Sequence, residues 1–196
     1  MLKDQLRNYI EKKQVLIIDS VIKELGISPS SVYRFIKDES LERVSKGVYV
    51  KSNLWNDEMN LLSKRTSVAV FSHESALLLH NLTDREPSSL TVTVPSTYNA
   101  SSLIKTGARV FYIKPDFLGI GKTNLMSLEG NLVPSYDLER TICDILRSRS
   151  QIDAQVVFGA LKAYIKRKDK RLDILSDYAK KFRISKLISQ YLGVLL

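Results

Sequence analysis

Small hydroxyls and cations alternate along residues 28–37, near the N-terminus. Serine hydroxyls can approach a nucleic acid closely and bond to phosphate or base edges, and an arginine can contact guanine through two hydrogen bonds. The segment also begins like a helix, because Ser28 can cap the first turn and Pro29 lacks the amide that would be left unpaired. We therefore expect a DNA-binding helix with six contact residues: Ser28, Ser30, Ser31, Tyr33, Arg34 and Lys37.

A second group of cations follows in residues 41–51, where the pattern changes from helical to β. Valines at positions 44, 48 and 50 break the helical period, and Gly47 can supply the positive φ of a tight turn. The segment therefore predicts a β-hairpin. Its cations would lie along the DNA backbone and contribute to position more than to sequence preference. They are Arg43, Lys46 and Lys51.

These residues must be positioned by other helices. Residues 2–12 and 15–25 carry apolar side chains at helical spacing, and Gly26 suits the turn after the second helix. Two helices joined by a glycine-containing turn and followed by a hairpin match the winged helix-turn-helix, whose second helix enters the major groove. A three-helix bundle with a solvated polar face is the alternative.

The C-terminal part holds most of the excess positive charge. Residues 160–196 contain ten basic and three acidic side chains, whereas residues 1–52 contain ten basic and seven acidic ones. Such a run can be only a solvated helix face, or it can be a surface that contacts operator DNA or RNA. The candidate residues of this accessory surface are Lys162, Lys166, Arg167, Lys168, Lys170, Arg171, Lys180, Lys181, Arg183 and Lys186.

The remaining pattern mixes helices and strands. We expect a linker at 53–56, a helix at 57–65, strands at 68–71, 90–94 and 109–113, a hairpin at 126–133, and helices from 137 to the end with a basic break at 166–171. The predicted fold class is α+β: a winged helix-turn-helix over residues 1–52, then a mixed α+β domain over residues 53–196 with a helical tail.

Composition narrows the cellular setting and the partner. The net charge of +9 and the pI near 9.6 favour a polyanionic partner. The single cysteine excludes an internal disulfide and a cysteine-rich zinc site. We find neither an apolar run long enough to span a bilayer nor a signal peptide, and we expect a cytoplasmic protein with no membrane partner.

Several partial motifs point to chemistry but lack essential positions. Residues 119–123 end like a phosphate-binding loop, but the first glycine is missing and a hairpin follows instead of a helix. His73 and Glu74 begin a zinc-protease motif, yet His80 is seven residues on instead of four. Arg140 and Asp144, four residues apart, predict a surface ion pair. Cys143 lies between isoleucines and predicts a buried thiol. We therefore expect no enzyme activity, no metal and no cofactor.

The N-terminal motifs, taken in order, resemble those of the AbiEi-type antitoxins, the transcriptional-regulator halves of bacterial abortive-infection toxin–antitoxin systems. The resemblance rests on residues 26–34 and 41–49, then on 72–77, 90–95 and 135–144, which follow the family's order and spacing over most of the chain. It implies a protein that represses its own operon through inverted repeats. It also implies a C-terminal domain that counters a nucleotidyltransferase-like toxin without a stable complex, as in type IV systems.

Two other classes remain open from the residues alone. The N-terminal fold could be a docking surface in a protein-interaction module. Alternatively, the C-terminal domain could be an enzyme that modifies the toxin, although no catalytic constellation is visible in it.

Overall fold

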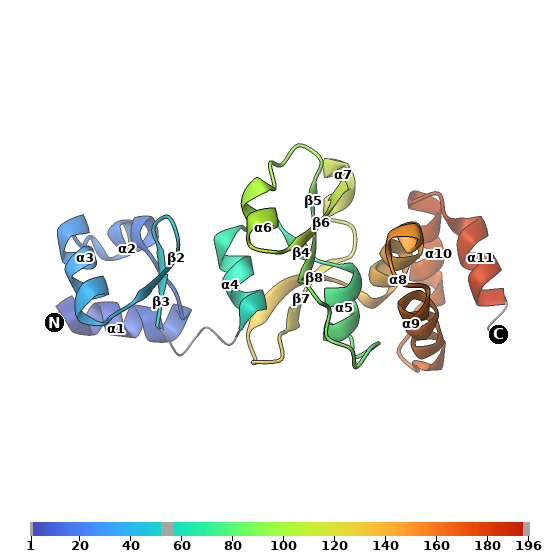
Figure 1. Cartoon of the computed structure of the whole chain (residues 1–196), viewed down its shortest axis with the longest axis horizontal. Coiled ribbons are helices and arrows are strands. Elements are labelled where there is room, and N and C mark those ends of the chain that lie inside the picture. The colour runs from blue at the N-terminus through green and yellow to red at the C-terminus, as the bar shows by residue number, and fades with distance from the viewer. Residues whose placement is uncertain (1, 52–56, 194–196) are drawn as a thin grey trace. The chain divides into compact units, whose positions relative to one another are not determined.

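A computed structural model describes residues 2–51 and 57–193 as a mixed α+β protein (Figure 1). The chain divides into two compact units, one up to Ser67 and the other from Val68. The sequence placed the boundary after residue 52, and the linker predicted at 53–56 lies outside the described residues. No helix in the described ranges is long and apolar enough to cross a membrane.

The first unit consists of helices and a small antiparallel sheet. The order of its three strands in the sheet is β1-β3-β2, and β2 and β3 form the hairpin predicted from the sequence. Its elements are α1 (Leu2–Lys13), β1 (Leu16–Ile17), α2 (Ile18–Leu25), α3 (Pro29–Asp38), β2 (Glu42–Ser45), β3 (Val48–Val50) and α4 (Glu58–Arg65).

The core of the first unit explains where its elements begin. Leu6, Val21 and Phe35 from the three helices are buried together, as the helical spacing predicted. The helix expected from residue 15 begins only at Ile18, because Leu16 and Ile17 pair with β3 instead. Leu61 of α4 packs with valines of the sheet, so this helix belongs to the first unit.

The second unit is built on a five-stranded mixed sheet in the order β6-β5-β4-β8-β7. The pairs β5–β6 and β4–β8 are parallel, and the pairs β4–β5 and β7–β8 are antiparallel. The strands are β4 (Val70–Phe71), β5 (Thr91–Pro95), β6 (Arg109–Ile113), β7 (Lys122–Met126) and β8 (Leu132–Tyr136). The first three lie close to the predicted positions, whereas the hairpin predicted at 126–133 is longer and spans Lys122–Tyr136.

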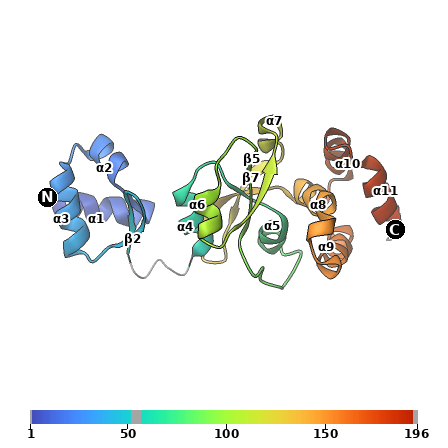
Figure 2. The ribbon, with the colours of Figure 1, turned by 45° about the horizontal axis from the view of Figure 1, so that its top comes forward.

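Helix α8 lies at the centre of the second unit's core. All its residues from Leu138 to Leu146 are buried, and it packs against α5, α9, α10 and α11. Figures 1 and 2 show α8 to α11 together on one side of the sheet. The helices are α5 (His73–Leu79), α6 (Ser101–Lys105), α7 (Pro115–Leu118), α8 (Leu138–Arg147), α9 (Ala154–Lys166), α10 (Leu172–Lys181) and α11 (Ser185–Gly193), with a 3₁₀ turn η2 (Arg149–Gln151).

Candidate nucleic-acid interface

Helix α3 begins with a hydrogen-bonded group of three serines. The Ser28 hydroxyl accepts a hydrogen bond from the Ser31 amide at 3.4 Å, as expected of an N-cap. It also bonds to the hydroxyls of Ser30 at 3.1 Å and Ser31 at 3.0 Å. Gly26 at the end of α2 has a φ of 65° and ends that helix, so α2 and α3 are joined by a short turn. The three serines thus hold the start of α3 before any ligand binds.

The outer face of α3 is polar and exposed. Val32 and Phe35 point into the core, whereas Tyr33 keeps 54% of its surface exposed. Arg34 and Lys37 are also exposed, and neither forms an ion pair within the described part of the chain. The face predicted from the sequence therefore offers an aromatic ring and two available cations.

Three acidic side chains of α2 and the end of α3 are paired with cations of α1. Three ion pairs connect α1 to α2 and to the end of α3: Lys3 with Asp38 (2.8 Å), Arg7 with Glu39 (2.7 Å) and Lys13 with Glu24 (2.6 Å). The hydrogen bond and charge of Lys3 lower the pKa of Asp38, so this carboxylate stays ionised and paired. The two carboxylates at the C-terminal end of α3, Asp38 and Glu39, therefore have cation partners on α1.

The three cations of the hairpin differ in how exposed they are. Lys46 lies exposed in the turn, next to Gly47, whose φ of 76° is the positive angle that the sequence predicted. Arg43 is exposed on β2, whereas Lys51 is half-buried at the end of β3. Lys51 is thus the least accessible of the predicted backbone contacts.

The accessory basic surface separates into two kinds of residues. Arg167 is bound within the second unit, because its guanidinium pairs with Asp169 at 2.7 Å and donates to the His80 carbonyl at 3.1 Å. Lys170 donates to the Arg167 carbonyl at 2.9 Å. The other predicted residues are exposed: Lys162, Lys166, Lys168, Arg171, Lys180, Lys181, Arg183 and Lys186.

The prediction of a surface pair between Arg140 and Asp144 is wrong, because both side chains are buried. Arg140 is 0% exposed, and its Nε donates to Asp144 at 2.9 Å. Its guanidinium carbon lies 4.0 Å from the ring centre of Tyr136 and 4.3 Å from that of Phe182. These rings come from β8 and from the residue after α10, so local helical spacing contains no sign of this burial.

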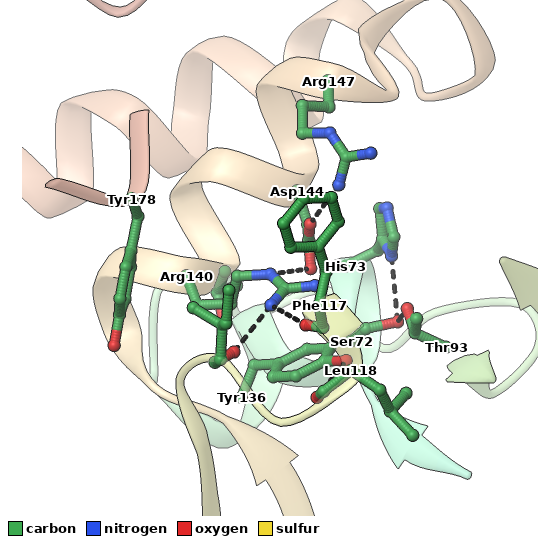
Figure 3. Close-up of polar contacts among 12 residues, drawn as sticks. Ser72, His73, Thr93, Phe117, Leu118, Tyr136, Arg140, Asp144, Arg147 and Tyr178 are labelled. Atoms are coloured by element: carbon green, nitrogen blue, oxygen red, sulfur yellow. Dashed lines mark hydrogen bonds and ion pairs between the residues drawn. The ribbon is translucent and has the colours of Figure 1, made fainter. Parts of the chain in front are cut away.

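Backbone carbonyls complete the surroundings of Arg140 (Figure 3). Its Nη1 donates to the carbonyls of Phe117 at 3.0 Å and Ile120 at 2.6 Å. Its Nη2 is buried and has no hydrogen-bond partner in the described residues, so cation–π contact replaces hydrogen bonding there. Asp144 also accepts from Arg147 at 3.2 Å. Burial raises the pKa of Asp144, although both arginines oppose this.

Gly121 permits this arrangement. Its φ is 71°, and a Cβ at this position would lie 2.7 Å from the Arg140 Cβ and 3.1 Å from the Asp137 carboxylate. The glycine that resembled part of a phosphate-binding loop therefore allows α8 to approach the chain closely. It is followed by strand β7, as the sequence indicated.

A second buried polar chain lies at the start of α5. Thr93 donates to the Ser72 hydroxyl at 2.8 Å, and that hydroxyl lies 2.9 Å from His73 Nδ1. His73 Nε2 is 3.0 Å from the Ser148 hydroxyl, and the ring stacks on Phe111 with centroids 3.5 Å apart. Burial lowers the pKa of His73 well below its usual value. Ser72 and His73 thus meet inside the core, where both side chains are buried.

The other chemical candidates are a metal site and the single cysteine. Within residues 2–51 and 57–193, no three His, Cys, Asp or Glu side chains are grouped so that they could hold a metal. Cys143 is buried as predicted, and burial raises the pKa of its thiol to about 12. The thiol therefore stays protonated and unreactive.

Comparison with solved structures finds a likeness of fold. The fold is similar to the crystal structure of the RV2827C protein from Mycobacterium tuberculosis, with a TM-score of 0.57 and 12% identity. The match covers 85% of this chain and 66% of that one, so this chain spans slightly less than two thirds of the solved protein's length. No family model matches the sequence, and neither does any curated protein. At this identity the likeness concerns the fold alone.

Proposed function

We propose that residues 2–50 form a winged helix-turn-helix that binds DNA, with α3 in the major groove and the β2–β3 hairpin as the wing. One observation carries the proposal: α3 presents Tyr33, Arg34 and Lys37 outward, while the two acids at its C-terminal end are paired with cations of α1. Helix α2, the short turn at Gly26 and the hairpin after α3 have the order that this motif requires.

We further propose that the protein is an antitoxin of the AbiEi type, which represses its own operon. The support is the order of the sequence motifs together with an α+β unit after the DNA-binding unit. In this proposal the second unit counters a nucleotidyltransferase-like toxin without a stable complex, in the cytoplasm. In this proposal the protein acts by binding and catalyses no reaction; the burial of Ser72, His73 and Cys143 supports this.

Operator binding can be tested with the DNA upstream of the protein's own gene. In a gel-shift assay, the full chain should retard a fragment containing the inverted repeats and not a scrambled one. Arg34→Ala should weaken binding by about 1–3 kcal/mol if Arg34 contacts a base through two hydrogen bonds. Lys12→Ala is the matched control, because Lys12 is an exposed cation on α1 outside α3 and the hairpin. Equal binding by both variants would remove Arg34 from the interface.

The antitoxin role needs a separate experiment. Expression of a nucleotidyltransferase-like gene next to this one should arrest growth, and co-expression of this chain should restore it. The Arg34→Ala variant should still restore growth under a foreign promoter, because the second unit carries that role in this proposal. Failure of the wild-type chain to restore growth would contradict the antitoxin proposal and leave DNA binding unaffected.

A further inference from the structure

A cavity of about 240 Å³ lies in the second unit between the start of α9, the turn η2 and α11. It is lined by Arg149, Ser150, Ala154, Val157, Phe158 and Tyr191. None of these residues takes part in the buried polar clusters or in the DNA-binding face proposed above. The cavity is thus a separate feature of the second unit.

Two aromatic rings form one side of the cavity. Phe158 is 47% exposed, although Val157 and Leu161 on the same helix are buried in the core. The rings of Phe158 and Tyr191 have centroids 5.8 Å apart and are tilted by 36°, so they touch without closing over each other. An exposed phenylalanine ring is poorly solvated by water and offers its face for stacking with a planar apolar group. Nucleobases are such groups, and they stack on aromatic side chains with little dependence on sequence.

Two exposed cations, Arg149 and Lys162, belong to the same region of the second unit. Arg149 is exposed, and its Nη1 donates to the Leu146 carbonyl at 3.2 Å, which holds the guanidinium in place. It has no ion pair within the described ranges. Lys162 is exposed one helical turn beyond Phe158, on the same face of α9. Asp153 is the acid at the start of α9, where its carboxylate accepts from the Gln155 amide at 2.7 Å as a helix cap.

We propose that this cavity binds a nucleobase that carries a phosphate. The base stacks on Phe158 and Tyr191, Arg149 pairs with the phosphate, and Lys162 contributes long-range attraction. The combination of stacking rings with a positive charge is the one that proteins use for unpaired nucleotides. The ligand can be a free nucleotide or the unpaired end of a nucleic acid strand, because both present the same chemistry. This site is independent of α3 and goes beyond the proposed repressor function.

The test uses the full chain and two probes, adenosine monophosphate by calorimetry and a fluorescein-labelled hexa-adenylate RNA by anisotropy. Phe158→Ala should weaken the binding of whichever probe the wild type binds by about 10-fold, since stacking is lost. Arg149→Gln should weaken it and reduce its salt dependence. Tyr112→Ala is the matched control, because Tyr112 is an exposed aromatic residue of the same unit, 52% exposed on β6. It should bind like the wild type.

The outcomes separate the ligand sources and can overturn the proposal. Binding of the mononucleotide, and its competition with the RNA, would indicate a free nucleotide, whereas binding of the RNA alone would indicate a strand end. Binding of ribose 5-phosphate as strong as that of adenosine monophosphate would contradict stacking. The proposal is wrong if neither probe binds at millimolar concentration, or if Phe158→Ala and Phe158→Leu bind like the wild type. Circular dichroism checks that each variant is folded, and Arg34→Ala should leave this binding unchanged whether or not α3 contacts DNA.

Discussion

Each unit contains an arginine and an aspartate four residues apart on one helix, exposed in the first unit and buried in the second. Arg34 and Asp38 are four residues apart on α3, and Arg140 and Asp144 are four apart on α8. On α3 the aspartate pairs with Lys3 at 2.8 Å, and Arg34 stays exposed without an ion pair in the described residues. On α8, the Arg140 Nε lies 2.9 Å from the Asp144 carboxylate, and both side chains are buried.

The difference comes from what surrounds each helix. Helix α3 has one face against the core and one in solvent, so Arg34 stays available for a ligand. Helix α8 is covered by other helices and by the chain at Gly121, so Arg140 must find all its partners inside the protein. A buried charge without partners is strongly destabilising, which explains why two carbonyls, one carboxylate and two rings gather around it. The same spacing thus leaves the arginine in solvent in one unit and buries it in the other.

The largest expected effect is the loss of the buried charge. Arg140→Met should lower the free energy of unfolding by about 3–5 kcal/mol, because Asp144 would lose its closest charged partner inside the core. Urea denaturation followed by circular dichroism measures the change. The double variant Arg140→Met with Asp144→Leu should recover much of the loss, since the one cation that then loses its partner, Arg147, is partly exposed to solvent. A loss below about 1 kcal/mol in the single variant would mean that Arg140 is not held as described.

The buried histidine predicts how stability depends on pH. The folded-state pKa of His73 is lowered, so below a pH of about 6.5 the unfolded chain binds a proton that the folded chain does not. Stability is therefore complete above that pH and falls as the pH decreases, by up to about 1.4 kcal/mol per pH unit for one proton. His80 acts in the same direction, because burial also lowers its pKa.

The variant His73→Asn isolates the contribution of His73. Asparagine tolerates the positive φ of 50° at this position and does not titrate. Thermal unfolding between pH 7.5 and 5 should show a smaller decrease in the melting temperature for this variant than for the wild type. If the melting temperatures of the variant and the wild type decrease equally with pH, His73 does not control the pH dependence of stability.

The exposed cations predict a change in the salt dependence of DNA binding. Lys46→Ala should weaken operator binding uniformly across sequences and reduce the slope of log K against log salt by about 1, as expected for one lost phosphate contact. The variant Lys180→Gln in the accessory basic surface provides the comparison. An unchanged slope for Lys180→Gln would assign that residue to solvent, and a reduced one would extend the interface to the second unit.

The smallest effect is expected on protein stability when Arg34, which is exposed on α3, is replaced. Arg34→Ala should change the free energy of unfolding by less than about 0.5 kcal/mol, as is usual for surface substitutions. The pKa of Asp38 is lowered, so its ion pair with Lys3 contributes above a pH of about 3.8 and is lost as the pH falls further. If Arg34→Ala lost as much stability as Arg140→Met, the two arginines would not differ in their contribution to folding, and the comparison would be wrong.

Local pattern was enough for most elements and for the accessible face of α3. Ser28 and Pro29 marked the start of that helix, and Gly47 marked the turn of the hairpin, because capping and positive φ depend on the residue itself and its neighbours. The buried state of Cys143 also followed from its apolar neighbours. The start of α2 did not follow, because Leu16 and Ile17 pair with a strand more than thirty residues later.

The sequence by itself determined the periodic elements, the excess of positive charge and the residues that α3 exposes. Only the tertiary structure decided which cations are available and which are used internally. Arg140 finds Tyr136 and Phe182 from distant segments, Arg167 finds the carbonyl of His80, and Phe158 meets Tyr191 of α11. Local spacing separates the apolar face of a helix from its polar face, but it contains no information on which distant segments cover a polar side chain.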